Sequence, residues 1–129
     1  MTPYEQAQQT LQMTAQERGL YERHLANLNG PGGVRHPDGS VSTLYQMGVQ
    51  GPDGQQYNIP SVYNGKILPP DQAIRNAAQQ GWYNFPAYPT PEAGETRYQQ
   101  MHQFMDQDVG QDLAKQKVRD ALLQQQGLR

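Results

Sequence analysis

Two Pro-Asp-Gly turns constrain this chain more than any other feature, because they punctuate an otherwise strand-like stretch. They lie at residues 37–39 and 52–54 and bracket the run 40–50. In such a turn proline presets φ, aspartate bonds its own backbone and glycine accepts a positive φ. A three-residue loop of this kind joins two antiparallel strands through a type I turn and a left-handed glycine. The sequence therefore predicts a β-hairpin closed at 52–54.

The hydrophobic pattern selects the register of this hairpin. With a three-residue loop, the facing pairs are Gly51 with Gln55, Val49 with Tyr57, Met47 with Ile59, Tyr45 with Ser61, and Thr43 with Tyr63. One face then carries mostly apolar or aromatic side chains, namely Thr43, Tyr45, Met47, Val49, Tyr57, Ile59 and Tyr63, and the other carries Gln46, Gly48, Gln50, Gln56 and Asn58. A two-residue loop would set Met47 against Asn58, so the period of two favours the three-residue loop.

The N-terminal segment has the spacing of one amphipathic helix over residues 3–28. Thr2 and Pro3 suit the N-cap and the first helical position, and the Gly- and Pro-rich residues 29–33 end the helix. The apolar residues on its main side are Tyr4, Ala7, Leu11, Ala15, Tyr21, Leu25 and Leu28. Met13 and Leu20 lie on the opposite side, which indicates a second contact surface.

Three more helices are predicted after the hairpin. A short one runs through 71–80, ends at Gly81, and turns inward the residues Ala73, Ile74, Ala77 and Ala78. An aromatic, proline-rich loop follows at 82–89. Thr90 then caps another helix, with Pro91 at its first position, and a final helix spans 108–126.

The final helix carries two apolar stripes. One consists of Ala114, Val118, Ala121 and Leu122, and the other of Val109, Leu113 and Leu123. A helix with two apolar stripes has two neighbours, and one small domain does not readily supply both. We therefore expect the second stripe to meet a partner; the alternative is that one stripe is simply exposed.

Together these elements predict an α+β fold, in which an antiparallel hairpin or short meander packs with helices between an N-terminal and a C-terminal helix. The predicted organisation is a docking helix at 1–29, a hairpin-plus-helix core module at 30–106 and a second docking helix at 107–129. The 129 residues suit one domain, but only 35% are hydrophobic. The core is therefore small, and partner surfaces are expected to complete it.

Composition argues against several classes of function. The absence of cysteine excludes disulfides and thiolate sites. A net charge of −2 gives no general attraction to nucleic acid or to an anionic membrane. The sequence has no apolar run long enough to cross a bilayer and no signal peptide at its start. We expect neither nucleic acid nor membrane as a partner, and no cofactor.

The residues that most often carry catalysis or bind metals have no recognisable arrangement. His24, His36 and His102 lack ligand spacing, and Asp38 and Asp53 most simply cap their own turns. Four acids are candidates for paired catalytic carboxylates but fit solvated helix faces better: Glu17, Glu22, Glu92 and Glu95. We therefore expect no enzyme, and a cell-wall hydrolase is the residual alternative.

The aromatic residues form the most interesting set: Tyr45, Tyr57, Tyr63, Trp82, Tyr83, Phe85 and Tyr88. They suit a hydrophobic core, a protein-binding hot spot or a platform for a glycan, and the sequence leaves all three open. Trp82 and Phe85 are expected to fold back on the apolar face of the hairpin. The candidate interface residues are Trp82, Tyr83, Phe85, Tyr88, Met13, Leu20, Val109, Leu113 and Leu123.

Several motifs in residues 30–106 follow one another in the order found in a known family. They are G-x-x-x-P-D-G-S-x-S-T at 33–43, I-P-x-V-x-x-G-K-I at 59–67, an acidic helix start followed by A-I at 71–74, and a T-P-E-A helix with tyrosine and histidine at 90–102. This region resembles a small domain of tailed-bacteriophage proteins. In that family the domain occurs in virion and tail-associated proteins, sometimes beside peptidoglycan-cleaving domains. The resemblance carries over no catalytic residue.

The resemblance implies a structural protein of a phage virion, made in the cytoplasm of the bacterial host and placed in the tail or at the head–tail vertex. It would act by packing against other virion proteins in a symmetric oligomeric assembly. A peptidoglycan- or glycan-binding module and a capsid decoration protein remain alternatives. On the interface hypothesis, Leu113→Asp or Leu123→Asp impairs assembly more than it unfolds the domain.

Overall fold

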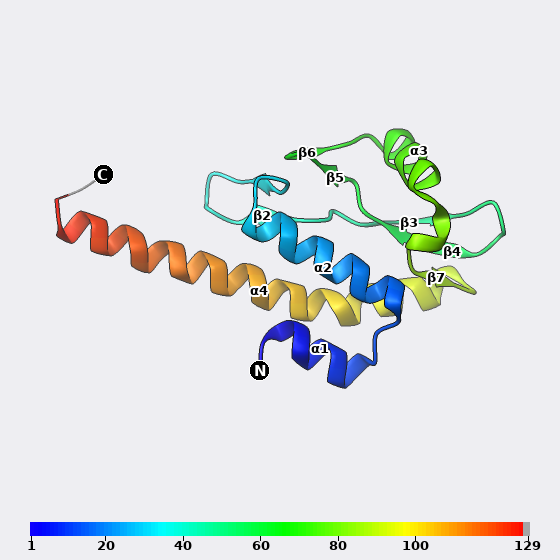
Figure 1. Cartoon of the computed structure of the whole chain (residues 1–129), viewed down its shortest axis with the longest axis horizontal. Coiled ribbons are helices and arrows are strands. Elements are labelled where there is room, and N and C mark those ends of the chain that lie inside the picture. The colour runs from blue at the N-terminus through cyan, green and yellow to red at the C-terminus, as the bar shows by residue number, and fades with distance from the viewer. Residues whose placement is uncertain (128–129) are drawn as a thin grey trace.

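A computed structural model describes residues 1–127 and shows an α+β architecture built along one long helix (Figure 1). Its helices are α1 (Pro3–Leu11), α2 (Ala15–Asn29), α3 (Pro70–Gln80), α4 (Pro91–Gln125) and the 3-10 turn η1 (Trp82–Asn84). Its strands are β1 (Val34–Arg35), β2 (Val41–Ser42), β3 (Met47–Gln50), β4 (Gln56–Ile59), β5 (Val62–Tyr63), β6 (Lys66–Ile67) and β7 (Ala87–Tyr88). All strand pairs are antiparallel. The predicted fold class is confirmed.

The β3–β4 hairpin has the predicted loop and register. Met47 lies opposite Ile59 and Val49 opposite Tyr57. The Gly51 N–H donates to the carbonyl of Gln55 at 2.8 Å, closing the loop. The turn chemistry of 52–54 and the alternation of side chains therefore sufficed to place this pair of strands.

The hairpin is shorter than predicted, and the expected pairs of Tyr45 with Ser61 and Thr43 with Tyr63 do not form. Beyond Met47, the N–H groups of Ser61 and Val62 both donate to the carbonyl of Leu44, which shifts the register. Pro60 has no N–H to continue the ladder. Tyr45 adopts a left-handed conformation with φ of 45° and is 63% exposed instead of lying on the apolar face.

A third strand, β7, pairs with the free edge of β4. It lies in the segment expected to be a loop, because a two-residue strand is too short to show periodicity. One face of this sheet packs on α3 and η1, where Phe85 and Trp82 meet Tyr57 and Ile59 as expected. The other face meets α4, and the Asn58 side chain donates to the carbonyl of Gly94 at 3.1 Å. The predicted polar face is therefore covered at Asn58, while Gly48 and Gln50 on the same face are exposed.

The N-terminal segment forms two helices, so the single helix predicted over 3–28 is wrong. The chain leaves α1 through Gln12, whose φ is 50°, and Thr14 caps α2 in a capping box with Glu17. The predicted start at Thr2 and Pro3 is confirmed. Both helices lie beside α4 (Figure 1).

Met13 and Leu20 belong to the core between these helices and α4, together with Ala7, Tyr21, Leu44, Met101 and Met105. They are only 3% and 4% exposed. Their assignment to an interface is therefore wrong. The bend at Gln12 turns α1 relative to α2, so the opposite sides of one expected helix no longer face different neighbours.

The last two predicted helices are one, since α4 runs without interruption for 35 residues. The expected division at residue 106 falls inside it. Residues 104–112, around the expected division, contain no proline, and Gly110 costs a helix only about 1 kcal/mol. The short helix α3 and its end at Gly81 match the prediction, although Ala78 is exposed instead of facing inward.

Candidate functional site

The N-terminal half of α4 packs on the rest of the molecule, which we call the body (Figure 1). A buried network centred on Asp108 holds it there. The Tyr21 hydroxyl donates to Asp108 Oδ2 at 2.6 Å, and His24 Nε2 lies 3.2 Å from the same oxygen. His24 Nδ1 lies 2.5 Å from Thr43 Oγ1. Because a carboxylate only accepts, Nε2 carries the imidazole proton and Nδ1 accepts from the Thr43 hydroxyl. The network joins α2, α4 and the segment before β3.

Burial decides the protonation state of this network. It lowers the pKa of His24, against the opposing effect of Asp108, so the ring is neutral at neutral pH. Burial and the hydrogen bond to Asp108 raise the pKa of Tyr21. The order carboxylate, imidazole, hydroxyl is that of a general-base relay. Here the imidazole and the hydroxyl are both buried, so we interpret the network as an internal connection that fixes α4.

A second buried network surrounds Glu17 at the other end of α2. Arg97 Nε donates to Glu17 Oε2 at 2.7 Å, and the Tyr88 hydroxyl donates to the same oxygen at 2.7 Å. Burial by itself would raise the pKa of Glu17, but hydrogen bonds from Arg97, Thr14 and Tyr88 outweigh it and hold the pKa below its ordinary value. Glu17 is therefore a buried anchor for α4 and β7, and its assignment to a solvated helix face is wrong.

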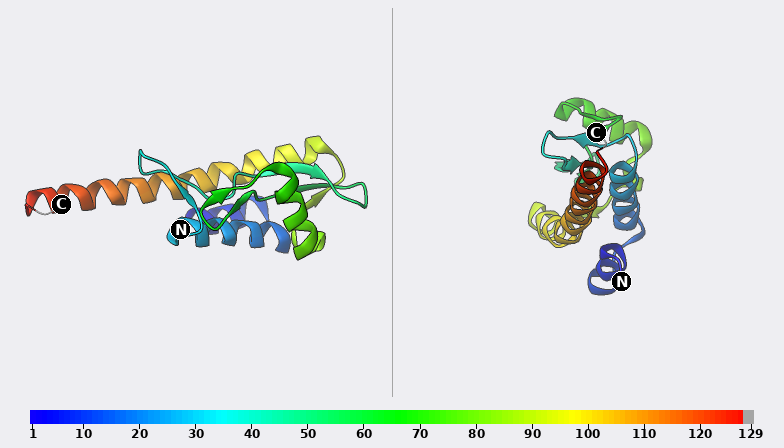
Figure 2. Two further views of the ribbon diagram at one scale, coloured as in Figure 1. Left: turned by 90° about the horizontal axis from the view of Figure 1, so that it is seen from above. Right: turned by 90° about the vertical axis from the view of Figure 1, so that its left-hand side faces the viewer.

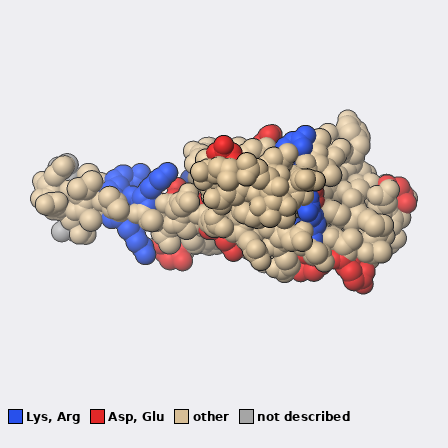
Figure 3. All heavy atoms as spheres, turned by 90° about the horizontal axis from the view of Figure 1, so that it is seen from below, with Lys and Arg blue, Asp and Glu red and all other residues tan. Residues whose placement is uncertain are grey.

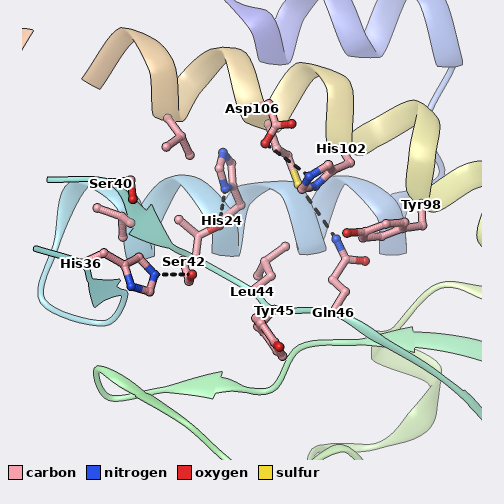
Figure 4. A pocket seen from close by; sticks show the side chains of 14 residues that line it. His24, His36, Ser40, Ser42, Leu44, Tyr45, Gln46, Tyr98, His102 and Asp106 are labelled. Carbon is pink, nitrogen blue, oxygen red and sulfur yellow. Dashed lines mark hydrogen bonds and ion pairs between the residues drawn. The ribbon is translucent and has the colours of Figure 1, made fainter. Parts of the chain in front are cut away.

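A groove of about 440 Å³ lies between α4 and the segment 40–46, with a lining of both polar and apolar side chains. All three histidines line it, so we call it the histidine groove (Figure 4). His36 Nε2 lies 2.7 Å from Ser42 Oγ, and His102 Nε2 lies 3.3 Å from Asp106 Oδ1. The histidines come from α2, α4 and the chain after β1, so no sequence spacing could have grouped them. Within residues 1–127, no three side chains of the ligand types are placed to hold a metal ion.

The C-terminal half of α4 extends past the rest of the molecule (Figures 1 and 2). Its contacts with the body include the turn before β2. Leu113 Cδ1 is 3.0 Å from where a Cβ on Gly39 would lie, and Gln116 Nε2 donates to the Gly39 carbonyl at 3.1 Å. Val109 lines the histidine groove. Val109 and Leu113 are thus turned toward their own chain, which corrects their assignment to an interface with a partner.

The opposite stripe of this helix is uncovered. Ala114, Val118 and Leu122, which we call the free stripe, follow one another at one residue per turn and line a shallow apolar surface. Val118 is 61% and Leu122 53% exposed. Lys115 and Arg119 border the free stripe, and Figure 3 shows Lys and Arg side chains gathered on this end of the molecule. The two stripes were visible in the sequence, but Val109 and Leu113 of the stripe expected to meet a partner are turned toward the body, and the other stripe is uncovered.

The remaining interface candidates differ in accessibility. Phe85 is buried in the core beside the sheet. Trp82 is partly buried, with its ring centroid 5.0 Å from that of Tyr57, and Tyr88 is partly buried beside Glu17. Tyr83 is 77% exposed, and Leu123 is partly exposed near the end of α4. Tyr83 is thus the most accessible of the four aromatic candidates.

Comparison of the chain with protein-family models, with curated proteins and with solved structures gives no match. The resemblance to a phage domain therefore stays a prediction. Among the described residues, none of the helices combines the length and the apolar composition that a bilayer crossing requires.

Proposed function

We propose that this protein is a structural component of a tailed-bacteriophage virion, in the tail or at the head–tail vertex, and that it acts by packing against other virion proteins. One observation carries the proposal: α4 projects from the body with the free stripe uncovered. The phage-like motifs of residues 30–106 support a tailed-bacteriophage virion as the assembly in which it docks.

A projecting helix of this kind suits docking for a physical reason. The part of α4 beyond Gln116 spans only residues 117–125. An isolated helix shorter than about 12–15 residues is marginal in water, and most helical stability comes from packing an apolar face. Val118 and Leu122 gain no such packing from the described part of the chain. Contact with a partner would bury them and stabilise the projecting segment at the same time.

The test is incorporation into particles. A tagged copy of the chain is produced during infection, and particles are purified on a density gradient. We expect the wild-type chain and Gln124→Asp to enter the particles, and Val118→Asp to be depleted by tenfold or more. Both variants add one aspartate to the same part of the helix, but only Val118 belongs to the free stripe. Equal incorporation of both variants, or absence of the wild-type chain from particles, contradicts the proposal.

A glycan-binding module carried by the virion is the second candidate. The observation that favours it is the histidine groove, with the exposed Tyr45 beside Gln46 in its lining. Aromatic and amide side chains together suit a sugar surface. On this hypothesis the protein is retained on insoluble peptidoglycan, and Tyr45→Ala abolishes retention without lowering the free energy of unfolding. Retention that is unchanged in this variant would exclude the groove as the glycan-binding site.

A further inference from the structure

We propose that the partner at the free stripe is an amphipathic helix from a different chain, whose apolar seam is flanked by acidic side chains. The inference rests on the proposed function, in that it takes the projecting half of α4 to be a docking element. It adds the chemistry of the partner, which the arrangement of charges around the stripe defines.

The free stripe has a cationic border on each side. At about 100° per residue, Ala114 and Leu122 lie within about 40° of Val118 around the helix. Lys115 lies about 60° and Arg119 about 100° to one side of Val118, and Lys117 lies about 100° to the other side. With Val118 at a seam position, Lys115 and Lys117 occupy the flanking positions of a coiled-coil seam, which set partner choice, and Arg119 lies just outside Lys115.

The acidic residues of this segment do not compensate the cationic borders. Asp120 lies about 160° around the helix from Val118. Asp112 accepts a hydrogen bond from Gln116 at 2.7 Å, and that glutamine also contacts the body. The charges that a docked helix would meet directly beside the stripe are therefore Lys115 and Lys117. Arg119 lies farther round the helix than Lys115, where it also lines a groove with Arg35.

This pattern argues against a second copy of the chain as the partner. In an antiparallel pair each cationic border would meet the same border of the other copy, and in a parallel pair it would meet the opposite one. Both arrangements bring cations together, and like charges beside a helix seam are destabilising. A helix with glutamate or aspartate at the flanking positions would instead form ion pairs on both sides.

Other anionic partners fit less well. The free stripe offers two large apolar side chains and no aromatic residue, whereas interfacial helices anchor in membranes through a broad apolar face. Three cations on a chain of net charge −2 give little of the phosphate neutralisation on which nucleic-acid binding depends. An acidic amphipathic helix would pack its apolar seam on the free stripe and form ion pairs with the cationic borders on both sides.

Binding of designed peptides to the full chain tests the inference. The probes are two three-heptad peptides with leucine at the seam, one with glutamate and one with lysine at every flanking position, so that each repels its own kind. In fluorescence anisotropy we expect the glutamate peptide to bind at least tenfold more tightly than the lysine peptide. We expect this difference to shrink as salt is added.

Two variants assign the effect to the stripe. Val118→Asp should abolish binding of the glutamate peptide, and the triple variant Lys115→Glu, Lys117→Glu, Arg119→Glu should reverse the preference between peptides. Circular dichroism checks that each variant keeps its helix. Equal binding of the two peptides, or binding of neither, overturns the inference.

Other occupants would be recognised in parallel measurements. Self-association in sedimentation that Val118→Asp removes would assign the stripe to a second copy, and binding to phosphatidylglycerol vesicles would assign it to a membrane. Either result overturns the proposal that the partner is an acidic helix. If Val118→Asp is depleted from particles but the triple variant enters normally, the free stripe is a docking surface, and only the proposal of an acidic partner is overturned. If neither substitution affects incorporation, the proposed function fails as well.

Discussion

At the scale of single residues, two buried polar groups connect α2 to α4. Glu17 and His24 both lie on α2, and both reach across to α4, where Arg97 and Asp108 meet them. A buried charge is tolerated only when it is paired and hydrogen-bonded. The two contacts therefore hold α4 against the body at two points.

Arg97→Ala should lower the free energy of unfolding by about 2–4 kcal/mol, because it leaves the buried Glu17 carboxylate without its cation. Arg97 itself is partly exposed, which places the effect below that of a fully buried pair. Arg75→Ala is the matched control, since its pair with Asp71 is exposed on both sides and is worth less than about 1 kcal/mol. Urea denaturation gives both values, and similar losses in the two variants would contradict the role of Glu17.

His24 should make stability depend on pH between neutral and mildly acidic conditions. Its pKa is lowered in the folded state, first by burial, so the unfolded chain binds the proton more readily. Stability is then fully present above the unfolded pKa of about 6.5 and falls as the pH drops below it.

Urea midpoints measured from pH 7.5 down to pH 5.5 test this dependence. The wild-type midpoint should fall over this range, and His24→Gln should be less stable at pH 7.5 but show a flatter profile. A wild-type midpoint that rises on acidification would show that His24 gains protons on folding, contrary to its burial.

At the scale of elements, glycine positions separate local propensity from packing. Gly110 lies in α4 and has no atom within 4 Å of where its Cβ would be. A Cβ at Gly33 would lie 2.6 Å from Val41 Cγ1 and 2.8 Å from the carbonyl of Asn27. The same substitution should therefore have opposite effects at the two sites.

Gly110→Ala should stabilise the protein by about 0.5–1 kcal/mol through helix propensity. Gly33→Ala should destabilise it, because the backbone of Asn27 cannot move aside as a flexible side chain would. Thermal unfolding followed by circular dichroism compares the two variants with the wild type. A loss of stability in Gly110→Ala would indicate that the helix bends or packs closely at this position.

At the scale of the whole molecule, the body and the projecting end of α4 should behave differently. A chain that ends at residue 116 keeps the Asp108 network and the contact of Gln116 with Gly39. A chain that ends at residue 106 loses both. Trp82 is the sole tryptophan and packs on Tyr57, so its fluorescence reports on the body.

The chain ending at 116 should have a free energy of unfolding within about 0.5 kcal/mol of the wild-type value, as expected for loss of an exposed segment. The chain ending at 106 should be destabilised by more than about 2 kcal/mol, because Tyr21 and His24 lose their buried partner. Equal stability of the two truncated chains would mean that the Asp108 network contributes little. A large loss in the longer chain would mean that the projecting end belongs to the body.

The sequence by itself determined the elements whose interactions are local. These elements depend on atoms within a few residues of one another, so they can be predicted from the sequence. They are the turn at 52–54, the helix caps at Thr2 and Thr90, and the end of α3 at Gly81. The break at Gln12 was also legible, because Thr14 and Glu17 form a capping box, but the long helical period concealed it. The same period revealed two stripes on the last helix without indicating which one faces the body.

Only the tertiary structure decided that orientation, and with it the candidate interface. Glu17 meets Arg97 across 80 positions of sequence and His24 meets Asp108 across 84, distances over which residue spacing carries no information. These contacts set the rotation of α4, turn Leu113 toward the body and leave Val118 in solvent. Periodicity defines the faces of a helix, but the choice between them depends on which neighbours the rest of the chain brings alongside.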